Sequence, residues 1–357
     1  ERPVQQVIVQ STGVGEGSAE QPKPAERPPQ KAAPEDLQKI VAGWKMIVGQ
    51  TTAAFKQALL QSVPKYNGET GEPILYVEFQ TPLGRLYPDD SEELVKTIED
   101  CFLHSFGPGK IPDIESFEGN DYPVNVMVPH AGFQYSGTIA AHSYCELAKN
   151  GFPEVFIIIG PNHTGLGSEV SVFNKGEWIT PLGNIQVDEE FADTLISFSD
   201  FASADFAAHM REHSIEVQLP FLQYFSNDFK IVPVVLGSQT ISAANDLAAA
   251  ILKAGEKLGK SYCVIASSDL SHFNTQERAN KVDGFVLEDI ENMDEFKLLE
   301  EIIQYNITMC GYGPVMTTMI LSKMCGKNTS EILAYKTSGD ISGDLSSVVG
   351  YASGIFK

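Results

Sequence analysis

Histidines follow three separate apolar runs of this sequence, each within a few residues of the end of its run. They are His130, His163 and His272. Imidazoles that are brought together can hold a divalent metal ion or carry out acid–base chemistry. A single histidine at the end of a strand is more often a hydrogen-bonded turn residue. It is therefore the coincidence of three that indicates a functional site.

A second polar cluster, Arg211–Glu216, precedes the apolar segment Val217–Leu222. One interpretation is the start of a helix, with Ser214 as the N-cap and an acidic first turn. The other is that Glu212 and His213 enter the pocket, where the carboxylate would orient a ligand histidine. The residue types favour neither interpretation over the other.

Cys310 stands directly before Gly311–Pro314. It is either a small buried residue or, as a thiolate near imidazoles, a ligand for a soft metal ion. The other histidines are weaker candidates for a functional site. His142 lies inside a predicted helix and is expected to pack, His104 lies near a Gly-Pro-Gly turn and is expected to be structural, and His209 stays open.

Short apolar runs alternate with helical stretches after residue 84, and this pattern predicts an α/β fold with a central, mostly parallel or mixed sheet flanked by helices. In such sheets ligands bind beyond the carboxyl ends of the strands, which is where the three histidines occur. The strands are expected at Val124–Val128, Val155–Ile159, Ile231–Leu236 and Tyr262–Ala266, with helices near 137–149, 242–258 and 275–290, sheet-like segments near 169–187 and a loop at Thr337–Asp344.

The N-terminal part has a different composition. Residues 1–36 are rich in Pro, Glu, Gln and Ala, which predicts a disordered linker. Residues 37–83 carry a helical pattern and then an apolar run, Pro73–Phe79, and predict a small helix–strand extension without a core of its own. Residues 84–357 are predicted to be the α/β domain.

The chain has 357 residues, 25 Lys plus Arg and 47 Asp plus Glu, which gives a net charge of 25 − 47 = −22. So acidic a protein is not expected to bind nucleic acid or anionic lipid. No apolar run reaches the length of about 18 residues that predicts a membrane span. The five scattered cysteines form no CxxC pair and the first residues do not form a signal peptide, so a cytoplasmic location is expected.

From about residue 84 to residue 357 the sequence closely resembles the Memo family. Its signature segments occur in order along the chain. They are Tyr87-Pro88-Asp89, Gly107-Pro108-Gly109, PHAGFQYSG at 129–137, GPNHTG at 160–165, EHSIEVQLPFL at 212–222, SSDLSH at 267–272, Cys310-Gly311 and TSGDISGD at 337–344. Patterns typical of α/β hydrolases, P-loop proteins and dinucleotide-binding proteins are absent from the sequence.

The resemblance implies a fold like that of class III extradiol dioxygenases, around a non-haem metal pocket. It implies His130, His163 and Cys310 as metal ligands, with His272 in the place of the acid–base histidine and Asp269 beside it. The expected pocket residues around this centre are Glu212, His213, Tyr135 and Asn162.

The third ligand departs from the dioxygenase pattern of two histidines and a carboxylate. A thiolate suits Cu(I) or iron, with zinc as the alternative, so ring cleavage does not carry over. The resemblance favours a non-haem metal-dependent oxidoreductase of unknown substrate. Its rivals are a binding module for an acidic or phosphorylated ligand and a metal carrier. The partners implied are a small-molecule or peptide ligand and radical-SAM and AMMECR-type proteins.

Residues 37–83 lie outside this resemblance. They resemble the C-terminal part of bacterial clamp-loader tau/gamma subunits, which also follows a Pro-rich linker. The abrupt change near Leu83–Leu86 predicts either a fusion or a foreign segment.

Overall fold

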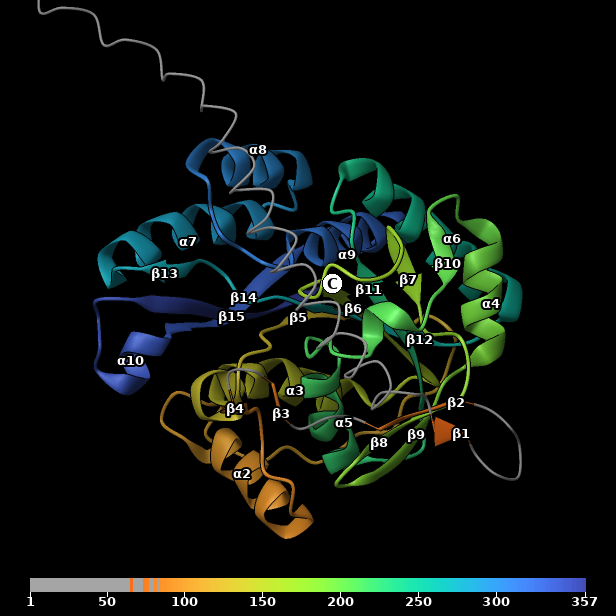
Figure 1. Cartoon of the computed structure of the whole chain (residues 1–357), viewed down its shortest axis with the longest axis horizontal. Helices are drawn as coiled ribbons and strands as arrows, with labels where there is room; N and C mark the ends of the chain where they lie inside the picture. Colours follow the sequence, from red (N-terminus) through yellow and green to blue (C-terminus); the bar gives the residue numbers. More distant parts are fainter. Residues whose placement is uncertain (1–64, 67–72, 77–79, 82–83) are drawn as a thin grey trace, which may run out of the picture. The chain divides into compact units, whose positions relative to one another are not determined.

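The computed structural model describes residues 65–66, 73–76, 80–81 and 84–357. These belong to one compact unit that runs from Pro64 to Lys357. The predicted linker of residues 1–36 and the helical part of the predicted helix–strand extension lie outside the described residues. The strand predicted at Pro73–Phe79 is described over Pro73–Tyr76. Figure 1 shows the α/β arrangement of the described part, with a sheet covered by helices on both faces.

The centre of the fold is formed by four parallel strands in the order β11-β6-β12-β5. Their bounds are β5 Asn125–Val128, β6 Val155–Pro161, β11 Lys230–Leu236 and β12 Tyr262–Ser267. Every residue of β5 and β6 is buried, as expected for strands covered on both faces. These are the strands predicted from the apolar runs, and the predicted α/β fold is confirmed.

Further strands extend this core into a nine-stranded mixed sheet. On one side β7 pairs antiparallel with β11 and parallel with β10. On the other side β15 pairs antiparallel with β5, β13 and β14. The bounds of these strands are β7 Val170–Val172, β10 Ala202–Ala204, β13 His272–Asn274, β14 Ser330–Thr337 and β15 Val348–Phe356.

Helices cover both faces of the sheet (Figure 1). The α-helices are α2 Ser91–Leu103, α3 Thr138–Asn150, α4 Glu189–Phe198, α5 Leu219–Phe225, α6 Ile241–Leu258, α7 Gln276–Glu291, α8 Glu295–Tyr305, α9 Tyr312–Met324 and α10 Ser338–Ser342. Short helical turns are η1 Phe133–Gly137, η2 Ala207–His209 and η3 Glu216–Gln218. Segment Thr337–Asp344 was expected to be a loop, and this was wrong for α10, where Thr337 and Asp340 form a capping box.

The period of two along β6 divides the core into two clusters. Ile157 and Ile159 pack in the cluster that contains residues of α4, α6, α7 and α9. Phe156 and Ile158 pack in the cluster that contains residues of α2, α3 and α5. Successive strand residues point to opposite faces, so the continuous apolar run supplies both helical layers.

Helix α6 shows how local sequence sets the element boundaries. The Thr240 side chain accepts a hydrogen bond from the backbone N–H of Ala243 and caps the N-terminus, and Gly259 ends the helix at φ +65°. Between them, small and branched side chains such as Leu247 and Ile251 form a fully buried face. The helix therefore begins and ends where its capping residues stand.

A smaller four-stranded sheet has the order β1-β2-β8-β9, and β3 pairs with β4. The strands of the four-stranded sheet are β1 Lys65–Tyr66, β2 Pro73–Tyr76, β8 Glu177–Thr180 and β9 Gly183–Gln186. The separate pair consists of β3 Gln80–Thr81 and β4 Gly84–Arg85. Strand β2 pairs in parallel with β8 of the α/β domain. The proposed boundary at residues 83 and 84 stays a prediction.

The parallel core determines where loop residues gather. Because β5, β6 and β12 run in the same direction, their carboxyl ends lie at one edge of the sheet. His130, His163 and Asp269 each follow one of these ends by two residues. The topology therefore brings distant parts of the chain to one place.

Gly160 tests how tightly this edge is packed. A Cβ atom at Gly160 would lie 2.2 Å from Ser214 Oγ and 3.0 Å from Ser214 Cβ. We expect Gly160→Ala to lower the free energy of unfolding by about 1–3 kcal/mol, because the 212–214 segment must move. The matched control is Gly284→Ala in α7, where no heavy atom lies within 4 Å.

The control should raise the free energy of unfolding by about 0.5–1 kcal/mol, because alanine is the better helix former. Urea unfolding of both variants measures the difference. Equal effects of the two substitutions would contradict close packing at Gly160.

Candidate metal centre

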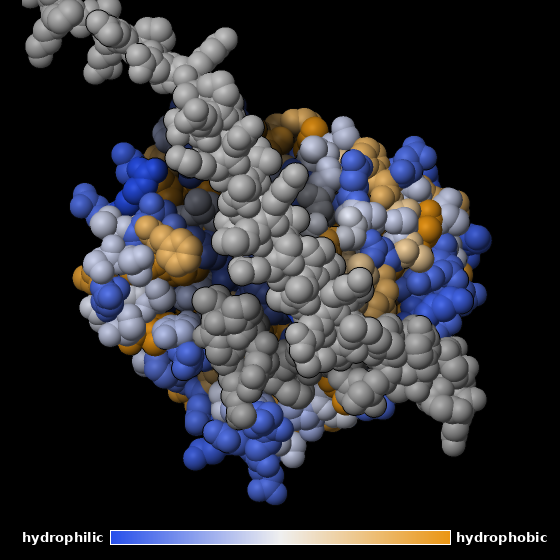
Figure 2. All heavy atoms as spheres, in the orientation of Figure 1, coloured by the Kyte–Doolittle hydropathy of each residue, from blue (hydrophilic) through white to orange (hydrophobic). Residues whose placement is uncertain are grey.

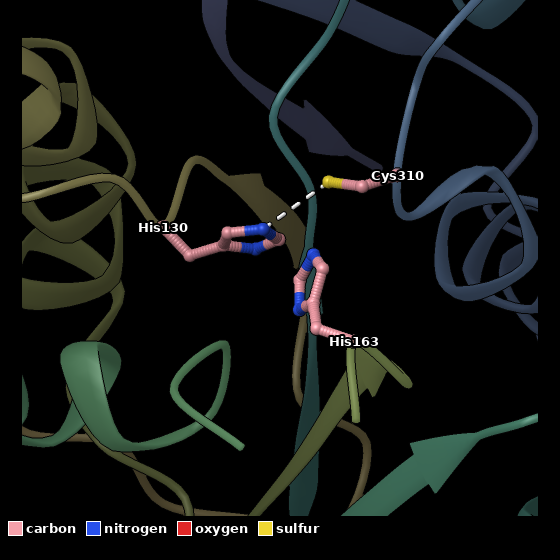
Figure 3. Close-up of side chains that lie close together, drawn as sticks. All are labelled: His130, His163 and Cys310. Carbon is pink, nitrogen blue, oxygen red and sulfur yellow. Dashed lines mark hydrogen bonds between the residues drawn. The ribbon is translucent and has the colours of Figure 1, made fainter. Parts of the chain in front are cut away.

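The structure brings His130, His163 and Cys310 together at the carboxyl edge of the sheet. One potential ligand atom of each residue lies within 4.8 Å of the other two. Cys310 Sγ is 3.2 Å from His130 Nε2, and the two imidazole centroids are 5.2 Å apart. Figure 3 shows the three side chains converging from three sides.

Hydrogen bonds determine the tautomer of His130, which is buried. Its Nδ1 lies 2.8 Å from Ser267 Oγ, and the Ser267 hydroxyl donates to the carbonyl of Ser214 at 2.6 Å. Ser267 Oγ has only one proton to donate, so it accepts from His130 Nδ1–H. His130 Nε2 is therefore left with its lone pair on the side of Cys310.

Ser267 was not singled out by the sequence, although it lies in the SSDLSH segment. Gln218 was missed as well. Its Nε2 donates to Ser267 Oγ at 3.0 Å, and its Oε1 accepts from the Tyr144 hydroxyl at 2.6 Å. A glutamine inside the apolar 217–222 segment was the available signal, because a buried amide requires partners.

His163 is held by Glu212. Glu212 Oε1 accepts from His163 Nδ1–H at 2.8 Å, and Oε2 accepts from the His163 backbone N–H at 2.7 Å. A carboxylate only accepts, so the proton is on Nδ1 and His163 Nε2 keeps its lone pair. A carboxylate bound in this way orients a histidine ring, and the role of His163 as a metal ligand stays a prediction.

Burial alone would raise the pKa of Glu212. The hydrogen bond from His163, the charges of His163 and His213 and the His163 backbone N–H outweigh it and lower the pKa to about 2. Burial lowers the pKa of His163, but the bond and charge of Glu212 raise it overall. Glu212 is therefore ionised throughout the neutral range and holds His163 in place.

The alternative interpretation of the 211–216 segment was a helix start capped by Ser214, and this was wrong. Ser214 Oγ lies 3.4 Å from the carbonyl of Pro161, and its backbone N–H donates to Glu212. The 3₁₀ turn η3 then leads into α5. Glu212 instead accepts hydrogen bonds from the backbone N–H groups of residues 163, 213 and 214.

His213 stacks on His163 with a centroid distance of 4.6 Å and an interplanar angle of 30°. Its ring also stands at 88° to His130, at 5.4 Å. Burial lowers the pKa of His213 to about 4, so the ring is neutral at pH 7. With His163 and Glu212 it forms a second group that could hold a metal ion.

Cys310 immediately precedes α9. Its Sγ contacts the carbonyl of Asp269 at 3.6 Å, and its own carbonyl accepts from Gln239 Nε2 at 2.8 Å. Burial and the nearby Asp269 charge raise the pKa of Cys310 well above its usual range. The sulfur is therefore a neutral thiol until a bound cation displaces its proton.

His272 is not in either metal-binding group of the described residues. Its backbone N–H donates to Thr308 Oγ1 at 2.7 Å, and its Nδ1 donates to the Thr308 carbonyl at 2.9 Å. A carbonyl cannot donate, so His272 Nε2 carries the lone pair. Thr308 was missed by the sequence, where nothing distinguished it.

Asp269 lies beside His130 and is almost completely buried. Its Oδ1 accepts from the His130 backbone N–H at 2.8 Å. Burial raises the pKa of Asp269, and the charge of His272 and the His130 N–H act against this. Asp269 thus supports the His130 loop, and its catalytic role stays a prediction.

The two remaining predicted pocket residues differ in position. Asn162 Oδ1 accepts from the N–H groups of Thr164 and Gly165 at 3.0 and 2.8 Å, and its Nδ2 donates to Leu166. It therefore shapes the loop that carries His163. Tyr135 lies in η1 and is 39% exposed.

The chemistry of the donor set fits a metal ion. Two imidazole Nε2 atoms and one thiol sulfur are the ligands that zinc, copper and iron bind. With bonds of about 2.0–2.3 Å, tetrahedral ligands stand roughly 3.3–3.6 Å apart. The 3.2 Å between His130 Nε2 and Cys310 Sγ is close to this spacing.

This site can be compared with known proteins. The sequence matches the family described as Memo-like protein over residues 80–355.

The chain belongs to the Memo-like family.

Relatives agree with this assignment. A MEMO1 family protein of Methanobrevibacter smithii is 99% identical over 274 residues, which cover 77% of this chain and 97% of that protein. A MEMO1 family protein of Methanopyrus kandleri is 46% identical over 278 residues, which cover 77% of this chain and 96% of that protein. A MEMO1 family protein of Methanocaldococcus jannaschii is 46% identical over 288 residues, which cover 79% of this chain and 99% of that protein.

A solved structure, an uncharacterized protein of Escherichia coli K12, has 11% sequence identity and a TM-score of 0.42, with coverage of 66% of this chain and 99% of that chain. This similarity is too low to carry an argument. Within the described part of the Memo-like chain, no helix is both long and apolar enough to cross a membrane.

Ser267 tests the tautomer argument. We expect Ser267→Ala to weaken Zn²⁺ binding about 10–100-fold, because His130 loses the acceptor that fixes Nδ1–H. The control is Ser143→Ala, which removes another buried hydroxyl that donates to the Met127 carbonyl at 2.8 Å. Competition with a chromophoric chelator gives both affinities, and equal affinities would contradict the role of Ser267.

His209, left open by the sequence, is 2% exposed and packs against Phe173 and Trp178. Burial lowers its pKa to about 4. Between this value and about 6.5 the unfolded chain binds more protons, so the free energy of unfolding should fall with falling pH by up to about 1.4 kcal/mol per unit.

His209→Gln should remove about one proton from this pH dependence, since glutamine does not titrate. Urea unfolding of the metal-free protein at pH 7, 6 and 5 measures the slope. An unchanged slope in the variant would show that His209 titrates normally in the folded protein.

Proposed function

We propose that this Memo-like protein is a non-haem metal-dependent oxidoreductase with one metal ion, iron or copper, held by His130, His163 and Cys310. The observation that carries the proposal is that both histidines donate their Nδ1–H to a protein group, His130 to Ser267 and His163 to Glu212. Their Nε2 lone pairs and the Cys310 sulfur are left to bind one ion. Three protein ligands leave a position for an exogenous molecule, as in catalytic sites.

When bound, such a metal would supply one-electron chemistry and activation of a small oxidant. The chain's own residues bind, orient and move protons. His272 Nε2 is available as a proton acceptor because Thr308 holds Nδ1–H. Glu212 stays ionised and keeps His163 oriented.

A metal carrier is the second candidate, and one observation favours it. The His163 side chain is 32% exposed, whereas that of its partner Glu212 is 1% exposed. An accessible ligand gives a route for metal exchange with another protein. The radical-SAM and AMMECR-type partners, and a small-molecule or peptide ligand, remain proposals.

The ligand set is tested with Co²⁺, which reports thiolate ligation through a charge-transfer band in the near ultraviolet. Wild-type protein should bind about one Co²⁺ and show this band, and Cys310→Ser should lose it. Cys325→Ser, which replaces another partly exposed cysteine, is the control and should keep it. A band that survives in Cys310→Ser would exclude this cysteine as a ligand.

His272→Ala separates proton transfer from metal binding. Because His272 belongs to neither metal-binding group, the variant should retain iron or copper at wild-type stoichiometry and lose at least about 10²-fold in metal-dependent oxygen uptake. Metal analysis of anaerobically purified protein and an oxygen-uptake screen measure both. Loss of the metal would make His272 a ligand, and the absence of any uptake by loaded wild-type protein would favour the carrier.

A further inference from the structure

Phe273 is the most exposed large apolar side chain among the residues that the structure describes, at 81%. Its backbone has φ +58°, in the left-handed region that a phenylalanine rarely adopts. For a residue with a Cβ this conformation is energetically unfavourable. The chain therefore keeps an aromatic ring in solvent on a strained backbone.

The neighbours of Phe273 hold it in this conformation. His272 is bound to Thr308 through its backbone N–H and its ring, and the pairing of β13 with β15 shifts register between His272 and Asn274. Thr275 then caps α7 by accepting from the Arg278 N–H. Phe273 therefore lies in an irregularity of the β13–β15 pairing, between His272 and Thr275, which are both held by hydrogen bonds.

The ring of Phe273 lies beside the candidate site. Its centroid is 5.9 Å from that of the His272 ring, at an interplanar angle of 62°. Figure 2 shows a group of hydrophobic atoms at the left of the visible face of the described part. The packing of the described core does not include Phe273. Neither the stability of the fold nor the hydrogen bonds of His272 require an aromatic side chain here.

Tyr135 is a second exposed aromatic residue, and it lies in η1, directly after the His130 loop. The exposed Phe273 ring next to His272 favours a flat apolar ligand, because aromatic faces bind such groups.

We propose that Phe273 is a specificity-determining residue, whose ring packs against the flat apolar part of a small organic ligand that binds the metal by its polar end. This inference rests on the proposed metal centre with an open position. It names the ligand class of that site as planar organic molecules with a metal-binding group.

The test uses the full chain loaded with Co²⁺ and three probes, acetohydroxamate, benzohydroxamate and 4-phenylbenzohydroxamate. All three carry the same chelating group, and they differ in the size of the flat apolar part. In wild-type protein the largest aryl probe should bind at least about tenfold more tightly than acetohydroxamate. Phe273→Gly should reduce this preference about tenfold and leave acetohydroxamate binding unchanged, and Phe273→Tyr should retain the preference.

Two controls separate a binding role from a structural one. Phe296→Ala removes another exposed phenylalanine, 65% exposed on α8, and should not alter the preference. Phe273→Gly should unfold at the same or a higher temperature than wild type, because glycine adopts φ > 0 without strain. Loss of the aryl preference in a protein of undiminished stability would support the inference.

Three outcomes would overturn it, and each has a distinct cause. An aryl preference that is absent in wild type, or that survives in Phe273→Gly, removes Phe273 from ligand binding while acetohydroxamate still binds. Dissociation of an oligomer in Phe273→Gly, measured by sedimentation, would assign the ring to an interface between copies. If no hydroxamate binds to the Co²⁺-loaded protein, the metal has no open coordination position. This result would contradict the proposed function as well.

Discussion

The candidate site depends on where two histidine protons are placed. His130 and His163 each donate Nδ1–H to the protein, one to a serine hydroxyl and the other to a carboxylate. An imidazole has one proton in its neutral form, so each donation leaves Nε2 as a lone-pair donor. Without these two hydrogen bonds the two imidazoles would be a mixture of tautomers. The two Nε2 lone pairs would then not both be available, with the Cys310 sulfur, to bind one cation.

The serine that fixes His130 is itself fixed by the interior. Ser267 Oγ donates to the Ser214 carbonyl and accepts from Gln218, whose own oxygen accepts from Tyr144. Each of these groups is buried, and a buried polar group that lacks its partner destabilises the fold. The orientation of His130 therefore depends on the packing of helices on one face of the sheet.

His272, the acid–base candidate, is held by different contacts from those that hold the candidate ligands His130 and His163. His272 is held by a loop residue, Thr308, two positions before Cys310, and its neighbour Phe273 takes a left-handed backbone conformation. Strained conformations persist where the surrounding structure determines them, and they concentrate at functional sites. The site therefore combines a buried, hydrogen-bonded half around His130 and Glu212 with a more exposed half at β13.

The strands of the parallel core and the helices between them could be predicted from the sequence, because buried strands and amphipathic helices have periods that local residues reveal. The family could be predicted as well, from its ordered signature segments. The sequence also placed His130, His163 and His272 after strands. Only the folded chain shows which of them meet and that Ser267 and Thr308 fix the tautomers of His130 and His272. It also shows that Glu212 accepts from His163 and that Ser214 does not cap the following helix. The physical reason is that hydrogen bonds between residues more than thirty positions apart depend on how strands are ordered in the sheet, and a local pattern contains no information on that order.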